Sequence, residues 1–156
     1  MNKLMPFCAC FLLFFISSCS FLKTSQETKK IISTKVESKN FTVGVNSANP
    51  LRMRPVQLTS DYTLRIKSDS AFAYLPYYGV AQIAPFSSEG GIKFAEPMID
   101  YKMSPNKRSS GWDIQFHVKS ELVLYTVNMN IYDNGSSVIT VSSFNRDVIS
   151  FNGEVK

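Results

Sequence analysis

The sequence predicts a mainly β protein in which a short N-terminal helix precedes an antiparallel meander of about eight strands. Apolar residues recur at every second position through most of residues 41–156, which is the spacing of a strand with one buried face. Turn-forming residues separate these rows at hairpin distances. No strong helical pattern follows Asn40, which excludes a parallel α/β sheet because every parallel connection needs a long crossover. The meander forms a barrel or a sandwich, and the alternation does not separate them because both bury one face of each strand.

Residues 1–18 have the pattern of an export signal. A single cation, Lys3, is followed by an apolar run from Leu4 to Ile16 and then by two serines. The run is shorter than the roughly 20 residues that a membrane-spanning helix needs. We therefore expect residues 1–18 to be a lipoprotein signal peptide that is removed.

The four residues Ile16-Ser17-Ser18-Cys19 resemble a lipobox. The resemblance implies that the Cys19 thiol receives diacylglycerol, that cleavage follows Ser18, and that the new amino terminus is acylated. Two or more acyl chains give stable anchoring, so the expected partner is a membrane reached through the lipid on Cys19. The alternative is an ordinary secretory signal with an incidental cysteine. Because Cys8 and Cys10 leave with the signal, the mature chain has no free thiol and no disulfide.

The residue after the lipobox bears on localisation. Ser20 stands where enteric bacteria use aspartate to retain lipoproteins in the inner membrane. We therefore expect a lipid-anchored protein of the cell envelope that is attached to the outer membrane. No acidic run follows Cys19, so we expect the protein to face the periplasm. Exposure on the cell surface is left open.

Residues 19–40 are polar and basic, and they are expected to form a tether and a short helix. Ile31, Ile32 and Val36 give a thin apolar stripe at helical spacing, although a disordered tether is a close alternative.

Residues 1–39 carry six cations and two anions, whereas residues 40–156 carry eleven cations and ten anions. The basic charge therefore belongs to the signal and tether, and the nearly balanced body argues against a nucleic-acid partner.

Residues 41–156 are expected to be a single antiparallel β domain. The apolar rows predicted to face its core are Phe41, Val43 and Val45; Tyr62, Leu64 and Ile66; Trp112, Ile114, Phe116 and Val118; Val123, Tyr125, Val127, Met129 and Ile131; Ile139 and Val141; and Ile149 and Phe151. His117 falls on the opposite face and should be exposed or lie in a polar lumen.

The turn Asp133-Asn134-Gly135-Ser136 can be tested for register. A two-residue loop would place Ile139 and Val141 on the polar face, whereas one further residue restores the apolar rows. We therefore predict a three-residue loop with Gly135 in the left-handed region, and Ile131 opposite Ile139.

The sequence offers little for catalysis or metal binding. His117 is the only histidine, and without a mature thiol it cannot build a common zinc site. We predict no catalytic residue, no metal, no cofactor and no enzymatic activity. The alternative is an envelope hydrolase that uses the acids Glu89, Glu96 and Asp100 around the Gly90-Gly91 loop.

An aromatic segment is the better candidate for binding. Residues 74–91 are apolar, but Pro76, Pro85 and three glycines prevent a regular central strand. Tyrosine offers an apolar face with a polar tip, which suits sugars, peptides or lipid. The candidate ligand-binding residues are Tyr74, Tyr77, Tyr78 and Phe86. The alternative is that these rings cap the open end of the sheet.

Several short motifs occur in an order that resembles a known family. They are Asn49-Pro50, Tyr74-Leu75-Pro76-Tyr77-Tyr78-Gly79, Gly90-Gly91-Ile92-Lys93-Phe94, Asp100-Tyr101, and Asn145-Arg146-Asp147-Val148-Ile149-Ser150-Phe151-Asn152-Gly153. The family consists of small envelope lipoproteins of Bacteroides-type bacteria, catalogued as a domain of unknown function. The resemblance implies a helix followed by an antiparallel β domain, and it implies no activity. Tyr78 stands where phenylalanine is usual, and Asn152 stands where an aromatic is usual.

Overall fold

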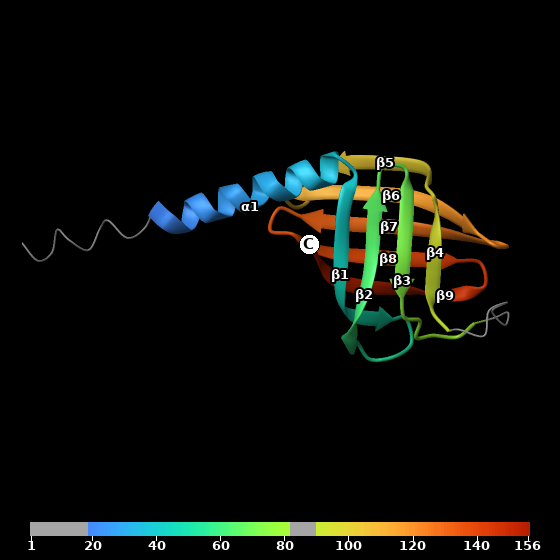
Figure 1. Cartoon of the computed structure of the whole chain (residues 1–156). Helices are drawn as coiled ribbons and strands as arrows, with labels where there is room; N and C mark the ends of the chain where they lie inside the picture. Colours follow the sequence, from blue (N-terminus) through green and yellow to red (C-terminus); the bar gives the residue numbers. More distant parts are fainter. Residues whose placement is uncertain (1–18, 82–89) are drawn as a thin grey trace, which may run out of the picture.

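The computed structural model describes residues 19–81 and 90–156, with side chains from residue 26 onward (Figure 1). The elements are α1 (Cys19–Glu37), β1 (Asn40–Pro50), β2 (Val56–Lys67), β3 (Ser70–Leu75), β4 (Ile92–Pro97), β5 (Ile99–Pro105), β6 (Gly111–Ser120), β7 (Val123–Tyr132), β8 (Ser136–Ser143) and β9 (Arg146–Val155). The predicted signal peptide, Phe86 and Glu89 lie outside the described residues.

The strands form one antiparallel sheet of nine, in the order β4-β3-β2-β1-β9-β8-β7-β6-β5. Every neighbour is also next in sequence except β1 and β9, whose pairing joins the first strand to the last. The sheet curls until β1–β4 run across β5–β9, which leaves β4 and β5 as its two outer strands (Figure 1). The predicted mainly β fold is confirmed, and it is a nearly closed barrel with nine strands.

The curl depends on β1, which pairs with one strand of each group, β2 and β9. Its pairing with β2 and with β9 shifts at Asn46, where a bulge bends the strand. Gly153 of β9 lies opposite Val45, and a Cβ at this glycine would collide with the carbonyl oxygen of Gly44. The absence of a side chain at Gly153 therefore lets β1 and β9 meet where the sheet turns.

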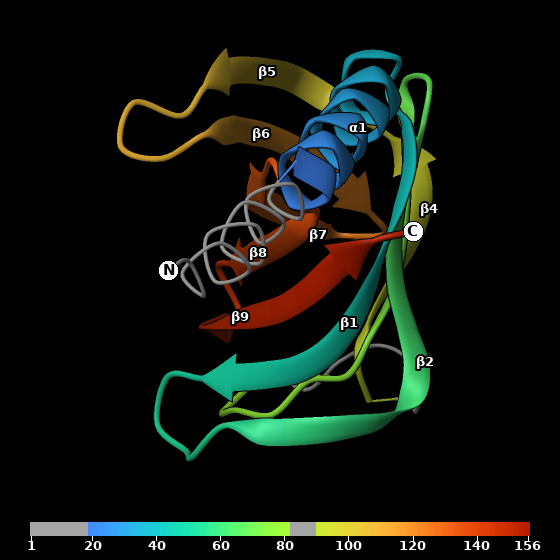
Figure 2. The same cartoon turned by 90° about the vertical axis from the view of Figure 1, so that its left-hand side faces the viewer.

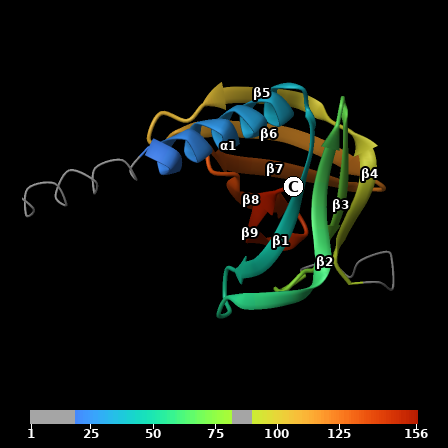
Figure 3. The ribbon, with the colours of Figure 1, turned by 60° about the vertical axis from the view of Figure 1, so that its left-hand side comes forward.

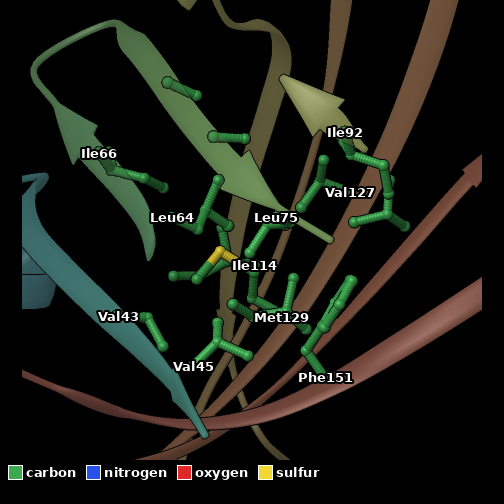
Figure 4. Packing of buried hydrophobic residues seen from close by; sticks show 14 of the residues in the cluster. Val43, Val45, Leu64, Ile66, Leu75, Ile92, Ile114, Val127, Met129 and Phe151 are labelled. Atoms are coloured by element: carbon green, nitrogen blue, oxygen red, sulfur yellow. The ribbon is translucent and has the colours of Figure 1, made fainter. Parts of the chain in front are cut away.

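The predicted apolar rows form the core. Phe116, Val127, Met129 and Ile131 are fully buried, and side chains from both groups of strands meet in the barrel interior (Figure 4). Tyr62 and Trp112, each the first residue of its row, are only half-buried, although both pack against the core. His117 is half-buried on the outer face, where its Nδ1 lies 3.0 Å from Thr126 Oγ1.

The turn between β7 and β8 has the predicted length but a different register. Residues 133–135 form the loop and Gly135 has a φ of 88°. However, Ile131 pairs with Ser137, and Ile139 pairs with Met129. The predicted pairing was therefore wrong by two residues. The alternation could not reveal this error, because a shift of two residues leaves every side chain on the same face of the sheet. The local turn decides instead: Gly135 N–H donates to Tyr132 O at 2.9 Å, and Ser136 N–H donates to Asn134 Oδ1 at 3.0 Å.

The helix α1 covers one end of the barrel (Figures 2 and 3). Ile32 and Val36 belong to the core cluster, whereas Ile31 is half-exposed. Lys29 Nζ lies 2.6 Å from Asp133 Oδ2, so the helix is also attached to the β7–β8 turn. The helix is therefore docked on the barrel through the part that runs from Lys29 to Val36. Within residues 19–81 and 90–156, no helix has the length and apolar character needed to cross a membrane.

Candidate functional site

The structure divides the predicted aromatic candidates between two places. Tyr74 lies in β3, which continues to Leu75, so the irregular segment begins at Pro76 and not at Tyr74 as predicted. Tyr77 and Tyr78 follow the strand at the end of the barrel remote from α1. Strand pairing therefore separates Tyr74 from the other two tyrosines. The alternation in the sequence did not reveal this pairing.

Strand β3 presents its aromatic side chains outward. Ala71, Ala73 and Leu75 are buried, while Phe72 and Tyr74 alternate with them on the opposite face. Two of the three inner positions of β3 are alanines, and the third is the fully buried Leu75. Phe72 was not among the predicted site residues. The alternation of small and aromatic residues in the sequence Ser70–Leu75 is the signal that could have identified it.

The surroundings of Tyr74 form a surface that we call the aromatic face. It consists of the outward positions in the part of β2 that pairs with β3, and in β3 and β4, with Tyr62 at the margin: Thr63, Arg65, Lys67, Ser70, Phe72, Tyr74, Lys93, Ala95 and Pro97. Asp61, the next outward position of β2, lies outside it. Tyr74 is 50% exposed, and its ring stacks on that of Tyr62 with centroids 5.5 Å apart. A shallow hollow of about 410 Å³ runs over this face between Thr42 and Ala95.

Two cations lie over the rings of the aromatic face. Lys93 Nζ is 5.1 Å from the centroid of the Tyr74 ring, and Arg65 Cζ is 4.5 Å from that of Phe72. Strand register explains both contacts, because Tyr74 pairs with Lys93 and Phe72 pairs with Arg65. The nine strand positions of the face hold three cations, including Lys67, and no carboxylate. The face therefore combines flat apolar rings with positive charge.

Tyr77 fastens the segment after β3 to the start of β9. Its hydroxyl lies 3.1 Å from Val80 O and 3.2 Å from Asp147 O, so its proton is shared between two backbone acceptors. The Arg146 guanidinium lies 5.1 Å from its ring centroid. Burial raises the pKa of Tyr77 above 10.0 because the phenolate would lose water, although the hydrogen bond to Asp147 opposes this rise.

Arg146 and Asp147 extend this attachment. Arg146 Nη1 donates to Gly91 O at 2.6 Å, and Arg52 Nε lies 3.1 Å from Asp147 Oδ2. Tyr78 is half-buried and packs against the core cluster. The contacts of Tyr77 and Tyr78 are thus those of residues that close the barrel end. A ligand-binding role for either tyrosine stays a prediction.

The acids of the alternative hydrolase do not form a visible pair. Glu96 is half-buried near the end of β4, and Asp100 is exposed at a bulge in β5, where its φ is 52°. The structure shows no hydrogen bond or ion pair between these two described residues. Across residues 19–81 and 90–156, no three His, Cys, Asp or Glu side chains come close enough to hold a metal ion.

Comparisons with known proteins agree with the fold. The chain is similar to a solved member of the DUF4251 family from Bacteroides eggerthii, with a TM-score of 0.63 and 13% sequence identity. The similarity covers 82% of this chain and 86% of the other. No curated protein matches the sequence. The family model described as "Domain of unknown function (DUF4251)" matches residues 23–155. This chain therefore belongs to the DUF4251 family.

Proposed function

We propose that this protein is a non-enzymatic binding protein of the bacterial cell envelope, anchored by lipid on Cys19, and that it holds its ligand on the aromatic face. The observation that carries the proposal is the outward orientation of Phe72 and Tyr74 on β3. Exposed rings that stack or lie flat on a sheet are typical binding surfaces, because they add apolar contact without a large loss of side-chain freedom.

The remaining aromatic candidates support the same division of roles. Tyr77 and Tyr78 are engaged by the protein's own backbone and core, so they are better suited to hold the barrel end than to receive a ligand. Tyr74 has half of its surface in solvent and lines a hollow. Among the three predicted residues that the structure describes, Tyr74 is the one whose position suits binding.

A direct test compares two exposed aromatic residues. The full-length protein is screened against envelope glycans, peptidoglycan fragments and fatty acids, and each hit is measured again with Tyr74→Ala. Phe144→Ala is the matched control, since Phe144 is also an exposed ring, with 65% of its surface in solvent, but lies in the β8–β9 turn. Loss of binding in Tyr74→Ala alone, with an unchanged melting temperature, is the expected result. Equal binding in both variants would contradict the proposed surface.

The anchor requires its own test. Cys19→Ala is expected to abolish labelling by a fatty-acid analogue, because the lipid is attached to the Cys19 thiol. Continued acylation of this variant would refute the lipobox. We further propose attachment to the outer membrane with the barrel facing the periplasm. Protease treatment of intact cells should then leave the protein intact, and rapid digestion would indicate surface exposure.

A further inference from the structure

We infer that the end of the barrel beside α1 rests on the anionic head groups of the membrane that holds the lipid on Cys19, and that the turn between β5 and β6 makes this contact. The inference rests on the proposed function, because it describes how the anchored barrel lies on its membrane. It is carried by the fold, which brings together the only two pairs of adjacent cations in the sequence, Lys29-Lys30 and Lys107-Arg108.

A chain of contacts joins α1 to the β5–β6 turn. Lys29 Nζ lies 2.6 Å from Asp133 Oδ2, and the backbone N–H of Asp133 donates to Ser110 O at 3.3 Å. Ser110 follows Arg108 by two residues, and it lines the same hollow of about 550 Å³ as Lys29. The β5–β6 hairpin projects beside the N-terminal half of α1 (Figures 2 and 3). The cations of the helix and of the hairpin therefore share one surface, which we call the basic end: Lys29, Lys30, Lys107 and Arg108.

Local hydrogen bonds fix the β5–β6 turn, which carries two of these cations. Asn106 Oδ1 accepts hydrogen bonds from the backbone N–H groups of Arg108 and Ser109, both at 2.9 Å. Asn106 Nδ2 donates to Asp113 Oδ1 at 2.6 Å, so the acid nearest to the turn in the sequence is held at the base of the hairpin. Lys107 and Arg108 are exposed, and neither forms an ion pair with any residue that the structure describes. The turn therefore presents two cations to the surroundings of the protein.

The charge of this end of the protein complements an anionic surface. Residues 26–37, 106–110 and 133–135 hold five cations and three acids, an excess of two, whereas residues 40–156 as a whole carry eleven cations and ten anions. The part of α1 toward Cys19, residues 19–25, adds one cation and no acid. Each lysine or arginine close to an anionic bilayer strengthens the contact about fivefold. The lipid on Cys19 places such a bilayer at the start of the same helix.

The length of α1 determines how the barrel must lie for this contact. Lys29 is ten residues beyond Cys19, which is about 15 Å along the axis of the helix. Charges are screened over about 8 Å at physiological salt, so an upright helix would hold the basic end beyond the attraction of the head groups. We therefore expect α1 to lie inclined, with Cys19 and the β5–β6 turn as two points of contact. Strands β3 and β4 lie on the far side of the barrel from the start of α1 (Figure 1), so this contact leaves the aromatic face uncovered.

The test uses the lipidated protein, purified from membranes and reconstituted in vesicles with a dansyl-labelled head group. Trp112, the only tryptophan, directly follows the β5–β6 turn, so energy transfer from Trp112 to the dansyl group reports how close the turn lies to the bilayer. We expect more transfer in vesicles that contain phosphatidylglycerol than in vesicles of phosphatidylcholine alone, and added salt should remove the difference.

Two double variants identify the cations that make the contact. Lys107→Gln with Arg108→Gln should weaken the contact roughly fivefold for each cation removed, and thus abolish most of the difference between the two vesicle types. Arg54→Gln with Lys119→Gln is the matched control, because it removes two exposed cations that lie outside the basic end. The control should leave the transfer unchanged. Both variants should keep the native melting temperature, because all four positions are exposed.

The outcomes separate this inference from the proposed function. Equal transfer in the two vesicle types, or unchanged transfer in the variant of the β5–β6 turn, would overturn the inference, while flotation of the protein with neutral vesicles would keep the lipid anchor. Absence of flotation with either vesicle type would overturn both. If soluble polyglutamate at the same anionic charge abolishes the transfer, the partner of the basic end is an acidic protein, and the inference is overturned in favour of that class.

Discussion

The docking of α1 onto the barrel can be tested with two adjacent isoleucines. Ile32 is 5% exposed and packs over the β7–β8 turn, so closely that a Cβ on Gly135 would lie 3.2 Å from its Cδ1. Ile31 is 49% exposed on the same helix. The substitutions Ile31→Ala and Ile32→Ala remove the same atoms from the same element, so the difference between them isolates burial.

The expected magnitudes follow from the atoms removed. Each substitution deletes three carbons, worth about 2.4 kcal/mol when fully buried, and gains about 0.4 kcal/mol from the better helix propensity of alanine. A cavity at position 32 adds to the loss, so Ile32→Ala should lower the free energy of unfolding by about 2–4 kcal/mol. At position 31 the side chain is about half-exposed, so only about half of the transfer free energy is lost and no cavity forms. After the gain in helix propensity, the cost of Ile31→Ala should stay below about 1 kcal/mol.

Urea denaturation of the two variants measures this difference. With a denaturant slope of about 2 kcal/mol/M, a 2 kcal/mol difference separates the two midpoints by about 1 M. Amide hydrogen exchange in α1 provides an independent readout, since an undocked helix would lose protection. Equal costs for the two substitutions, or a loss of helix protection without a change in global stability, would refute the docked helix as part of the folding unit.

Three further predictions concern the barrel. Phe116→Ala should cost about 3–5 kcal/mol in urea denaturation, because this buried ring also stacks on Tyr101; a cost near zero would mean that the strand faces are inverted. Gly111→Ala should destabilise the protein by well over about 1 kcal/mol, since Gly111 has a φ of 145° and a Cβ there would strike the backbone of β7; melting temperatures would show this. Finally, the raised pKa of Tyr77 means that its contribution to stability is present below pH 10.0 and is lost as pH rises through the folded-state pKa. Tyr77→Phe should therefore lose less stability above pH 10 than the native protein, and parallel curves would contradict this.

Much of the barrel wall could be predicted because burial has a period of two along a strand. Phe41, Leu64, Phe116 and Ile139 all face the core as their rows indicated. The same rule could not choose the β7–β8 register, since a shift of two residues preserves every face. The alternation also could not distinguish a barrel from a sandwich, because that difference depends on the bend of β1 and its pairing with β9.

The candidate site was predictable only in part. The sequence indicated a group of tyrosines, but Tyr74 and Tyr77 are three residues apart along the chain and differ in role. Tyr74 continues a strand and points outward, whereas Tyr77 follows Pro76 and meets the backbone of Asp147, seventy residues away in the sequence. Contacts between such distant segments leave no periodic trace in the sequence.

The sequence by itself determined which residues alternate, where the turns occur, and that the body carries almost no net charge. These properties are local or additive, so they can be read without knowledge of the fold. The tertiary structure alone decided that Arg65, Phe72, Tyr74 and Lys93 share one surface, because three strands must pair in a particular register to bring them together. It also decided that the aromatic residues of β3 face outward, because Ala71, Ala73 and Leu75 occupy the inner positions of this strand.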